Sequence, residues 1–461
     1  MKVAAFSEQE IHHILDNFQV QINIHSNPYN IPLHQLFQMA ARINTKRSFL
    51  FVSKILGKHL AVKPLIPLLT GTLLAMRYKE IVHGEKDERA QVIATALQSK
   101  QNLYQLQALI ENEPIPLAVP ITIIGFAETA TALGHAVFHS FNNNASYIHT
   151  TRENIQNLSS SIHFEEEHSH ATSHRVYALD DTFLKNNQEI VLVDDEITTG
   201  KTALNIIRTL KEYNPTKKVF SIVSILDWRT AEHREQYRQL EKELNITIHV
   251  ISLIEGNITI NGTPTLAREQ KETISSTQQE ITFIPLYEHM EKDNFLPFSS
   301  TSENQTKHPS PYLKSTGRFG LTKEEDILFS NQCCDLAQYV ANYRKGTKSL
   351  VIGTGEFMYI PMKIASEMGN GIYYQSTTRS PIYQTEHETY SIRSKFTFES
   401  PENPGVTNHL YNIESSQYDD VFIFIERLST YDHIHSLIEE LKRTHIPHIN
   451  IVVMTKAGED Q

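Results

Sequence analysis

The chain has 461 residues, more than one hydrophobic core ordinarily holds, so we expect about two or three domains. Hydrophobic residues make up 40% and charged residues 21%, a composition typical of soluble globular proteins. The formal net charge of -11 argues against a general nucleic-acid-binding surface, because such surfaces are usually basic.

The N-terminal sequence MKVAAFSEQEIHHIL lacks an apolar run of signal-peptide length, and no stretch of about 18 apolar residues occurs in the chain. The two cysteines, Cys333 and Cys334, are adjacent, so we expect reduced thiols rather than a disulfide framework. These features predict a cytoplasmic protein that binds neither membranes nor nucleic acids.

The first 75 residues are expected to form a helical hood over a core at residues 76–255. Residues 31–57 carry apolar side chains at helical spacing, and residues 47–59 also have a helical pattern. On such a helix Lys54 and Lys58 lie on the same face.

The core alternates between the two kinds of element. Strands are expected at residues 117–125, 146–149, 190–193, 219–226 and 246–251, and helices at 127–141 and 200–213. This alternation predicts an α/β fold with a parallel sheet covered by helices. The polar residues 150–175 between these elements are expected to form a mobile loop.

The segment VLVDDEITTGKT, residues 191–202, carries the main functional signal. A buried strand ends at Asp194 and Asp195, which are placed to accept hydrogen bonds from ribose hydroxyls or to help hold Mg²⁺. A short loop then opens a helix, whose first N–H groups and partial positive charge suit a phosphate. Gly200 lets the backbone approach that phosphate closely. The predicted phosphate-binding residues are Thr198, Thr199, Gly200, Lys201 and Thr202.

Two other interpretations of this segment are open. The letters GKT resemble the end of a Walker A loop, but that loop needs a glycine five residues before Gly200, where the chain has Asp195. The run IVLVDDE resembles a Walker B strand, but no Walker A loop occurs elsewhere. The other alternative is a plain buried strand with an acidic turn and a capped helix.

VLVDDEITTGKT resembles the ribose-phosphate signature of type I phosphoribosyltransferases, nearest to the orotate phosphoribosyltransferase subgroup. The resemblance implies that the acidic pair contacts the ribose hydroxyls of 5-phosphoribosyl-1-pyrophosphate and that the loop binds its 5-phosphate. Thr198 stands where purine-salvage members carry an aspartate, which argues against a hypoxanthine- or guanine-type acceptor.

Further segments resemble a narrower group, in which a phosphoribosyltransferase is paired with a "TRSP" domain. They are RSFLFVSKILGKH, PLLTG, IIGFAETATALGH, HTTRE and TTRSP at residues 377–381. This group is associated with bacterial tellurium-resistance and stress gene clusters. We therefore expect a TRSP domain at residues 318–461, after a polar linker at 256–317 that contains one strand at 281–285.

The same resemblance implies a supporting site. The pyrophosphate loop would consist of Gly125, Phe126, Ala127, Glu128 and Thr129, although a simple strand-to-helix turn is an alternative. Arg152 and Arg175 flank the polar loop, which would be the catalytic flap. Lys54 and Lys58 would face the pyrophosphate or the base, unless they form only a solvated basic face. The run HFEEEHSHATSH at residues 163–174 favours a polar loop over a metal site, because it has no regular frame and no cysteine.

The C-terminal region repeats the first domain. IIGFAET matches VIGTGEF with Gly125 and Gly353 228 positions apart, and YIHTTRENI matches YQSTTRSPI at a spacing of 227. VLVDDEITTG matches FIFIERLSTY at a spacing of 231. We infer a diverged copy whose three matched segments converge at one edge of a second sheet. Its expected anion pocket comprises Gly353, Gly355, Thr377, Thr378, Arg379, Ser380 and Glu426.

These patterns predict a phosphoribosyltransferase that uses phosphoribosyl pyrophosphate and Mg²⁺ to ribosylate an unidentified base-like molecule. Asp194, Asp195, Arg152 and Arg175 are the expected catalytic residues, and a homodimer is possible. The alternative is a non-catalytic sensor of phosphoribosyl pyrophosphate or a partner-binding module. The cationic flap residues favour the enzyme.

Overall fold

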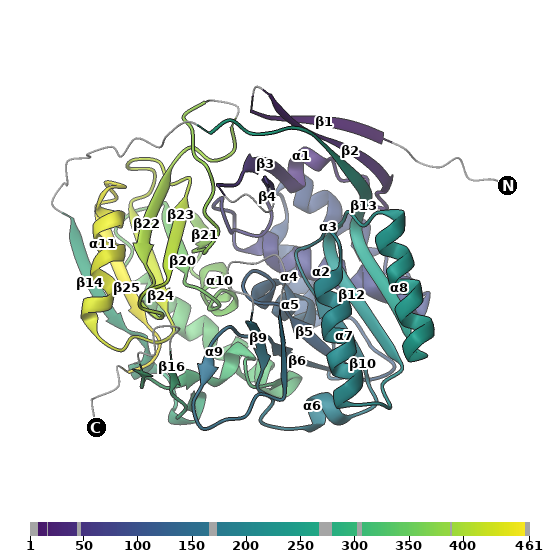
Figure 1. Ribbon diagram of the computed structural model, residues 1–461. Coiled ribbons are helices and arrows are strands. Elements are labelled where there is room, and N and C mark those ends of the chain that lie inside the picture. The colour runs from purple at the N-terminus through teal and green to yellow at the C-terminus, as the bar shows by residue number, and fades with distance from the viewer. Residues whose placement is uncertain are drawn as a thin grey trace.

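The computed structural model describes residues 8–15, 17–43, 48–165, 173–266, 279–301, 307–387 and 390–456. Two sheets dominate these residues, with helices between them and on their outer faces (Figure 1). Residues 8–262 are called the N-terminal unit below, and residues 280–456 the C-terminal unit. Every helix within the described ranges is too short or too polar to span a lipid bilayer.

The first sheet has the strand order β1-β2-β13-β12-β10-β5-β6-β19. Its centre is parallel, as predicted, and its edges are antiparallel. The parallel strands are β5 (Ile121–Gly125), β6 (Ala145–His149), β10 (Glu189–Val193), β12 (Val219–Asp227) and β13 (Thr247–Gly262). The others are β1 (Glu8–Leu15), β2 (Phe18–Ser26) and β19 (Leu321–Thr322).

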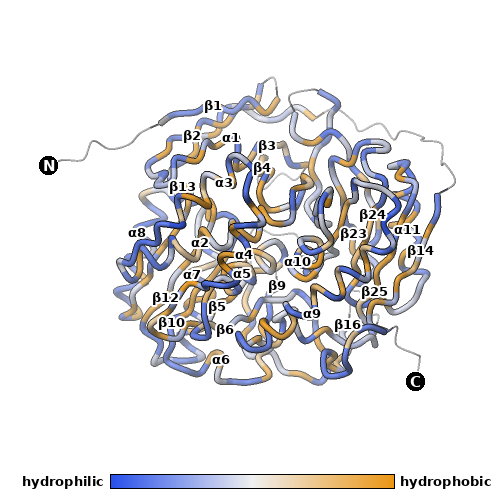
Figure 2. Tube along the Cα trace, turned by 180° about the vertical axis from the view of Figure 1, so that it is seen from behind, coloured by the Kyte–Doolittle hydropathy of each residue, from blue (hydrophilic) through white to orange (hydrophobic). Residues whose placement is uncertain are grey.

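Both faces of this sheet are covered because its strands are apolar on both sides. Val191 and Val193 pack in a core with α2 (Leu65–His83) and α5 (Ala130–His139). Ile190 and Leu192 point the other way, toward α7 (Lys201–Tyr213) and α8 (Ala231–Leu244). In Figure 2 the central strands are largely orange and α8 is largely blue. The short helices α3 (Arg89–Ser99) and α4 (Leu103–Asn112) pack on α2.

The second sheet is parallel throughout, in the order β14-β25-β24-β20-β21. Its strands are β14 (Glu280–Pro285), β20 (Ser349–Gly353), β21 (Ile372–Ser376), β24 (Asp420–Ile425) and β25 (His448–Val453). Its helices are α9 (Lys323–Ala341), α10 (Tyr359–Glu367) and α11 (His435–Lys442).

The predicted duplication is confirmed by the topology of the two sheets. The order β21-β20-β24-β25 repeats the order β6-β5-β10-β12. The register repeats as well, because Gly125 lies opposite His149 and Val193, while Gly353 lies opposite Ser376 and Phe424. The fifth strand differs, since β14 enters from upstream of its sheet whereas β13 follows β12.

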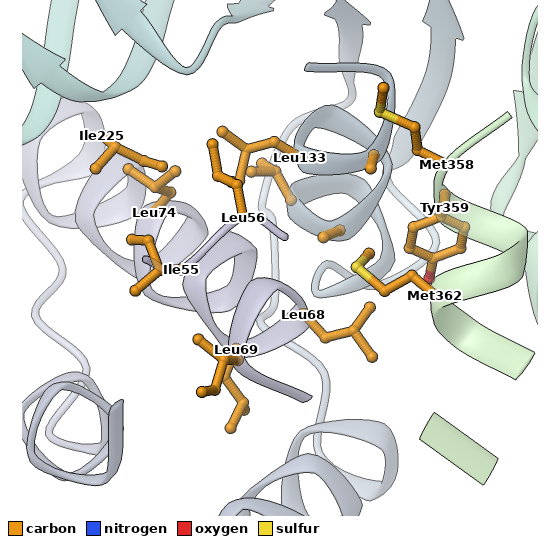
Figure 3. Close-up of a cluster of buried hydrophobic side chains, with 14 of the residues drawn as sticks. Ile55, Leu56, Leu68, Leu69, Leu74, Leu133, Ile225, Met358, Tyr359 and Met362 are labelled. Atoms are coloured by element: carbon orange, nitrogen blue, oxygen red, sulfur yellow. The ribbon is translucent and has the colours of Figure 1, made fainter. Parts of the chain in front are cut away.

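The two units share one hydrophobic core. Leu133 of α5 and Leu68 of α2 lie near Tyr359 and Met362 of α10 (Figure 3). The ring of His135 stacks on that of Tyr359 with centroids 3.6 Å apart and planes 8° apart. The units are therefore joined by core packing as well as by the chain.

The predicted helices at residues 31–57 and 47–59 are wrong. A single turn, α1 (Leu33–Leu36), is followed by an antiparallel pair, β3 (Phe37–Ala41) and β4 (Phe49–Ser53). Four consecutive side chains of β4 are buried, so its apolar residues occur side by side instead of at helical spacing. Lys54 and Lys58 therefore do not share a helical face.

The polar stretch at residues 256–317 is not a simple linker in its described parts. β13 continues through Gly262, β14 joins the second sheet, and Tyr312 and Leu313 are fully buried. At least one of its polar residues bonds to a distant segment, since Ser310 donates to the carbonyl of Leu428 (2.9 Å). The short strands here are β15 (Phe295–Leu296), β16 (Ser300–Thr301), β17 (Lys307–His308) and β18 (Tyr312–Leu313).

The polar region at residues 150–175 contains regular structure on both sides of a gap in the described residues. After β7 (Asn154–Ile155), the strands β8 (Ile162–Glu165) and β9 (Ser173–Val176) form an antiparallel hairpin. Residues 166–172, within the His-rich run, lie outside the described residues. The corresponding hairpin of the C-terminal unit is formed by β22 (Lys395–Glu399) and β23 (Thr407–Tyr411).

Candidate functional site

A cavity of about 530 Å³ opens at the carboxyl edge of the first sheet. The segments that follow β5 and β10 form its floor, and the β3–β4 hairpin and Trp228 form a wall. Because ligands of open parallel sheets bind at this edge, this cavity is the candidate site.

The segment after β10 brings the predicted acidic pair and phosphate loop into this cavity. The backbone N–H of Asp194 bonds to the carbonyl of Val223 (3.0 Å), and that of Asp195 bonds to the Asp194 carboxylate (2.9 Å). Gly200 has φ 75°, and a Cβ there would lie 2.1 Å from the Tyr237 hydroxyl, so only glycine fits. The cavity is lined by Asp194, Asp195, Thr198, Thr199, Gly200 and Thr202, whereas Lys201 begins α7 outside it.

The segment after β5 forms the neighbouring part of the floor. The N–H of Phe126 bonds to the carbonyl of Val193 (3.1 Å), which ties this loop to the acidic pair. The N–H of Ala127 bonds to the hydroxyl of Thr150 (2.9 Å). A Cβ on Gly125 would lie 2.5 Å from the carbonyl of Ala130, so glycine allows the loop to turn tightly into α5. Phe126, Ala127, Glu128 and Thr129 line the cavity.

Only some of the predicted cationic residues reach the cavity. Lys58 lines it and donates to the hydroxyl of Thr129, and Arg152 lines it and donates to the carbonyl of Ala127 (3.4 Å). Arg175, on β9, stands behind Arg152 and donates to its carbonyl (3.3 Å). Lys54 lies outside the cavity, where burial and then the charge of Lys100 lower the pKa of its ammonium group.

An aromatic wall lines the other side of the cavity and was not predicted. It consists of Phe49 and Phe51 on β4 and Trp228 after β12. The rings of Phe51 and Trp228 stack with centroids 5.4 Å apart. The sequence held a signal for this wall, because the single tryptophan of the chain lies two residues after a predicted strand.

His59 also borders the cavity, although no role was predicted for it. Burial, and then the positive charges of Lys58 and Arg42, lower the pKa of His59 well below its usual value. The ring is therefore neutral at physiological pH, and it can donate one hydrogen bond and accept another.

The predicted pocket of the C-terminal unit is divided in the structure. Its three segments do converge, since Gly355 donates its N–H to Thr377 (2.9 Å) and Thr354 donates to the carbonyl of Phe424 (2.9 Å). However, Thr377, Thr378 and Glu426 are buried, whereas Arg379 and Ser380 line the cavity of the N-terminal unit. There the Arg379 guanidinium lies 3.2 Å from the Glu128 carboxylate. The expectation of one separate anion pocket formed by Gly353, Gly355, Thr377, Thr378, Arg379, Ser380 and Glu426 is thus corrected.

A buried network of charges occupies the corresponding edge of the second sheet. Glu426 stands where the first unit has Asp195, and it accepts two hydrogen bonds from Arg318 (3.0 and 2.9 Å). Glu402 accepts the backbone N–H of Glu426 (2.8 Å), and Arg427 pairs with Glu153 (2.8 Å). All five side chains are at least nine-tenths buried, so this edge is filled by the chain itself.

We expect Glu402→Gln to reduce the pH dependence of stability. Burial, and then the negative charges of Glu426 and Glu153, raise the pKa of Glu402 to about 8, against about 4.3 for an unperturbed glutamate. Between these values the folded chain holds a proton that the unfolded chain has released. The stabilisation from this group is therefore complete below about pH 4 and is lost as the pH rises to about 8.

The measurement is urea unfolding of both proteins at about pH 5, 6.5 and 8. The free energy of unfolding should fall less steeply with pH in the variant than in the wild type. Equal slopes would contradict the assignment of a raised pKa to Glu402.

No group of three or more His, Cys, Asp or Glu side chains is arranged to hold a metal ion among the residues that the structure describes. His163 and His174 of the His-rich run lie on the facing strands β8 and β9. Cys333 and Cys334 are free thiols, the first buried and the second exposed.

The acidic pair, the glycine loop before α7 and the loop after β5 meet in one cavity at the carboxyl edge of a parallel sheet, where proteins of this architecture commonly bind phosphorylated ligands. The chain matches the family described as phosphoribosyl transferase over residues 36–257, and the TRSP domain found C-terminal to that transferase over residues 315–441. The chain therefore contains a phosphoribosyl transferase domain followed by a TRSP domain, and it is an enzyme of the pentosyltransferase type.

A search of curated proteins finds no match. Among solved structures, the chain is similar to an adenine phosphoribosyl transferase from Trypanosoma brucei at 10% identity and a TM-score of 0.28, covering 53% of this chain and 86% of that one. It is also similar to an adenine phosphoribosyltransferase from Giardia lamblia (15% identity, TM-score 0.20, 33% and 76% covered). A hypoxanthine-guanine phosphoribosyltransferase from Bacillus anthracis gives 12% identity and a TM-score of 0.19, with 37% and 70% covered.

Proposed function

We propose that this enzyme transfers the 5-phosphoribosyl group of phosphoribosyl pyrophosphate to a flat, base-like acceptor. The observation that carries the proposal is the single cavity that holds an acidic pair, two anion-type backbone loops and an aromatic wall. The acidic pair suits ribose hydroxyls, the loop at the start of α7 suits the 5-phosphate, and the loop after β5 suits the pyrophosphate.

The chain's own residues would lower the barrier by positioning and by charge. A nucleophilic atom of the acceptor attacks C1 of the ribose while pyrophosphate leaves, so positive charge develops on the sugar and negative charge on the leaving group. Lys58 and Arg152, beside the loop after β5, stabilise the leaving pyrophosphate. Asp194 and Asp195 hold the ribose in line with both groups.

Magnesium is part of this proposal. Carboxylate oxygens are the ligands that Mg²⁺ prefers, and Asp194 and Asp195 present them in the cavity. When bound with phosphoribosyl pyrophosphate, the ion would supply charge neutralisation at the phosphates. A cytoplasmic location and a place in a tellurium-resistance or stress-linked pathway also belong to the proposal, since they rest on sequence features and family resemblance.

The test is incubation of the protein with phosphoribosyl pyrophosphate, Mg²⁺ and a cell metabolite extract. Pyrophosphate release that depends on the extract, together with a new ribosylated mass, is the expected result. A protein that neither binds phosphoribosyl pyrophosphate nor releases pyrophosphate would contradict the proposal and leave a partner-binding role.

The aromatic wall predicts the class of acceptor. Because Trp228 is the only tryptophan, its fluorescence reports directly on this wall. We expect flat heteroaromatic bases, titrated with phosphoribosyl pyrophosphate present, to quench this emission. Phe51→Ala should weaken the binding of the acceptor roughly tenfold, since aromatic pairs contribute about 0.5–1.5 kcal/mol beyond the area they bury.

Phe283→Ala is the matched control, because that ring is exposed on the second sheet and contacts Tyr431. It should leave the titration unchanged. If aliphatic amines quench Trp228 as strongly as flat bases, or if Phe51→Ala has no effect, the acceptor is not stacked on this wall.

A further inference from the structure

The two units meet through equivalent residues. By the spacing of the repeat, Glu128 corresponds to Glu356, 228 positions later, and Arg152 corresponds to Arg379, 227 positions later. Glu128 lies against Arg379 (3.2 Å), while Glu356 accepts the backbone N–H of Arg152 (2.7 Å) and the hydroxyl of Thr151 (2.6 Å). Each unit's glutamate loop therefore faces the other unit's Thr-Thr-Arg segment, as across an approximate two-fold axis.

The reciprocal contacts between the units extend to the segments that precede α2 and α9, the first long helix of each unit. The carbonyl of Gly57 accepts the N–H of Ser376 (2.7 Å), and the carbonyl of Gly317 accepts the N–H of His149 (3.2 Å). Both glycines have positive φ, 74° and 83°, and each carries its neighbouring segment onto the edge of the other unit's sheet. Because of this pairing, the C-terminal unit lies at the border of the N-terminal unit's site.

The symmetry ends at the two sites themselves. A cation follows each glycine, but Lys58 lines an open cavity whereas Arg318 is buried on Glu426 and Glu356. The edge of the second sheet is therefore filled by buried side chains, whereas the cavity at the edge of the first sheet is open. Side chains of the C-terminal unit that face this cavity can therefore contribute only to the site of the N-terminal unit.

Arg379 of the C-terminal unit faces the cavity of the N-terminal unit. It lies beside Glu128, in the loop that we assign to pyrophosphate, and its side chain is 15% exposed. A carboxylate next to a pyrophosphate would repel it, so a neighbouring guanidinium serves both to balance Glu128 and to offer its forked N–H groups to the anion.

We propose that Arg379 of the C-terminal unit is a ligand-binding residue of the N-terminal site, where it contacts the pyrophosphate end of phosphoribosyl pyrophosphate. This inference rests on the proposed function and assigns the C-terminal unit a role in it. The C-terminal unit completes the site of the N-terminal unit, and Ser380 extends the same contact surface.

The test is calorimetric binding of phosphoribosyl pyrophosphate and Mg²⁺ to the full chain. Arg379→Ala should weaken binding about tenfold to a hundredfold, since a lost hydrogen bond to a charged group has this effect. Arg379→Lys, which keeps the charge without the fork, should restore part of the affinity. Arg393→Ala is the matched control, because Arg393 lies in the same unit with its side chain 55% exposed, 3.7 Å from Glu414.

The outcomes separate the two proposals. A wild-type chain that does not bind phosphoribosyl pyrophosphate overturns the proposed function. A wild-type chain that binds, with Arg379→Ala binding equally well, overturns the role of Arg379 alone. The comparison is repeated in a Glu128→Gln background, where Arg379→Ala must still weaken binding. If it has no effect there, Arg379 only neutralises Glu128 and does not contact the ligand. Unchanged thermal unfolding of Arg379→Ala and of Arg379→Lys excludes a folding defect as the cause.

Discussion

Replacing Asp194 and Asp195 together by asparagine is expected to reduce pyrophosphate release by about 10²–10³-fold or more, the usual cost of removing a positioned electrostatic contact. The substitutions keep the size of both side chains and remove both negative charges at the end of β10. The loss should appear in kcat as well as in binding, because in the proposed mechanism these carboxylates hold the ribose while charge develops on it.

The chain contains a matched control for this experiment. Asp180 and Asp181 are also adjacent aspartates, but they are exposed and lie outside the cavity. Their double replacement by asparagine should leave pyrophosphate release near the wild-type rate. A well-folded Asp194→Asn and Asp195→Asn variant with full activity would remove this pair from the ribose site.

Among these variants, Arg318→Met is expected to lower the free energy of unfolding the most. Arg318 is 1% exposed and holds Glu426 with two hydrogen bonds and Glu356 at 3.5 Å. Methionine would leave both buried carboxylates without their cation, and breaking a buried pair in this way costs about 3–5 kcal/mol. The free energy of unfolding in urea is the measurement.

Two further variants make the test specific. Arg208→Met breaks an ion pair with Glu243 in which the two side chains are 45% and 53% exposed, so it should cost less than about 1 kcal/mol. Adding Glu426→Gln to Arg318→Met should recover part of the loss, because one unpaired charge is removed. Equal losses in Arg318→Met and Arg208→Met would mean that the buried network does not contribute more than a surface pair.

The acidic pair and the phosphate loop could be predicted because their signal is local. The strand, the two aspartates, the glycine and the start of the helix all lie within twelve consecutive residues, 191–202. Chain order alone places such residues at the carboxyl edge of the sheet, and the repeat spacings likewise predicted that three segments of the C-terminal unit meet at one edge of the second sheet.

Other parts depend on contacts between distant segments, which one sequence does not encode locally. The strand at Phe49–Ser53 is buried on both sides, so a short apolar run there fits a strand and a helix equally well. The repeat correctly related Arg379 to Arg152, but it did not indicate that Arg379 crosses to the other unit. The Ser- and Thr-rich stretch before α9 resembled a linker, because its composition does not reveal bonds to distant segments such as the one from Ser310 to Leu428.

The fused arrangement has a consequence for how this enzyme can vary. In a dimer of identical chains every substitution alters two sites at once, so neither can be given up without the other. Here the two halves are encoded separately. Arg318 and Glu426 could close one site while Asp194, Asp195 and Gly200 kept the other open. Because the two halves are fused in one chain, they can accumulate different substitutions. The C-terminal half can therefore lose its own cavity and still contribute side chains to the cavity of the N-terminal half.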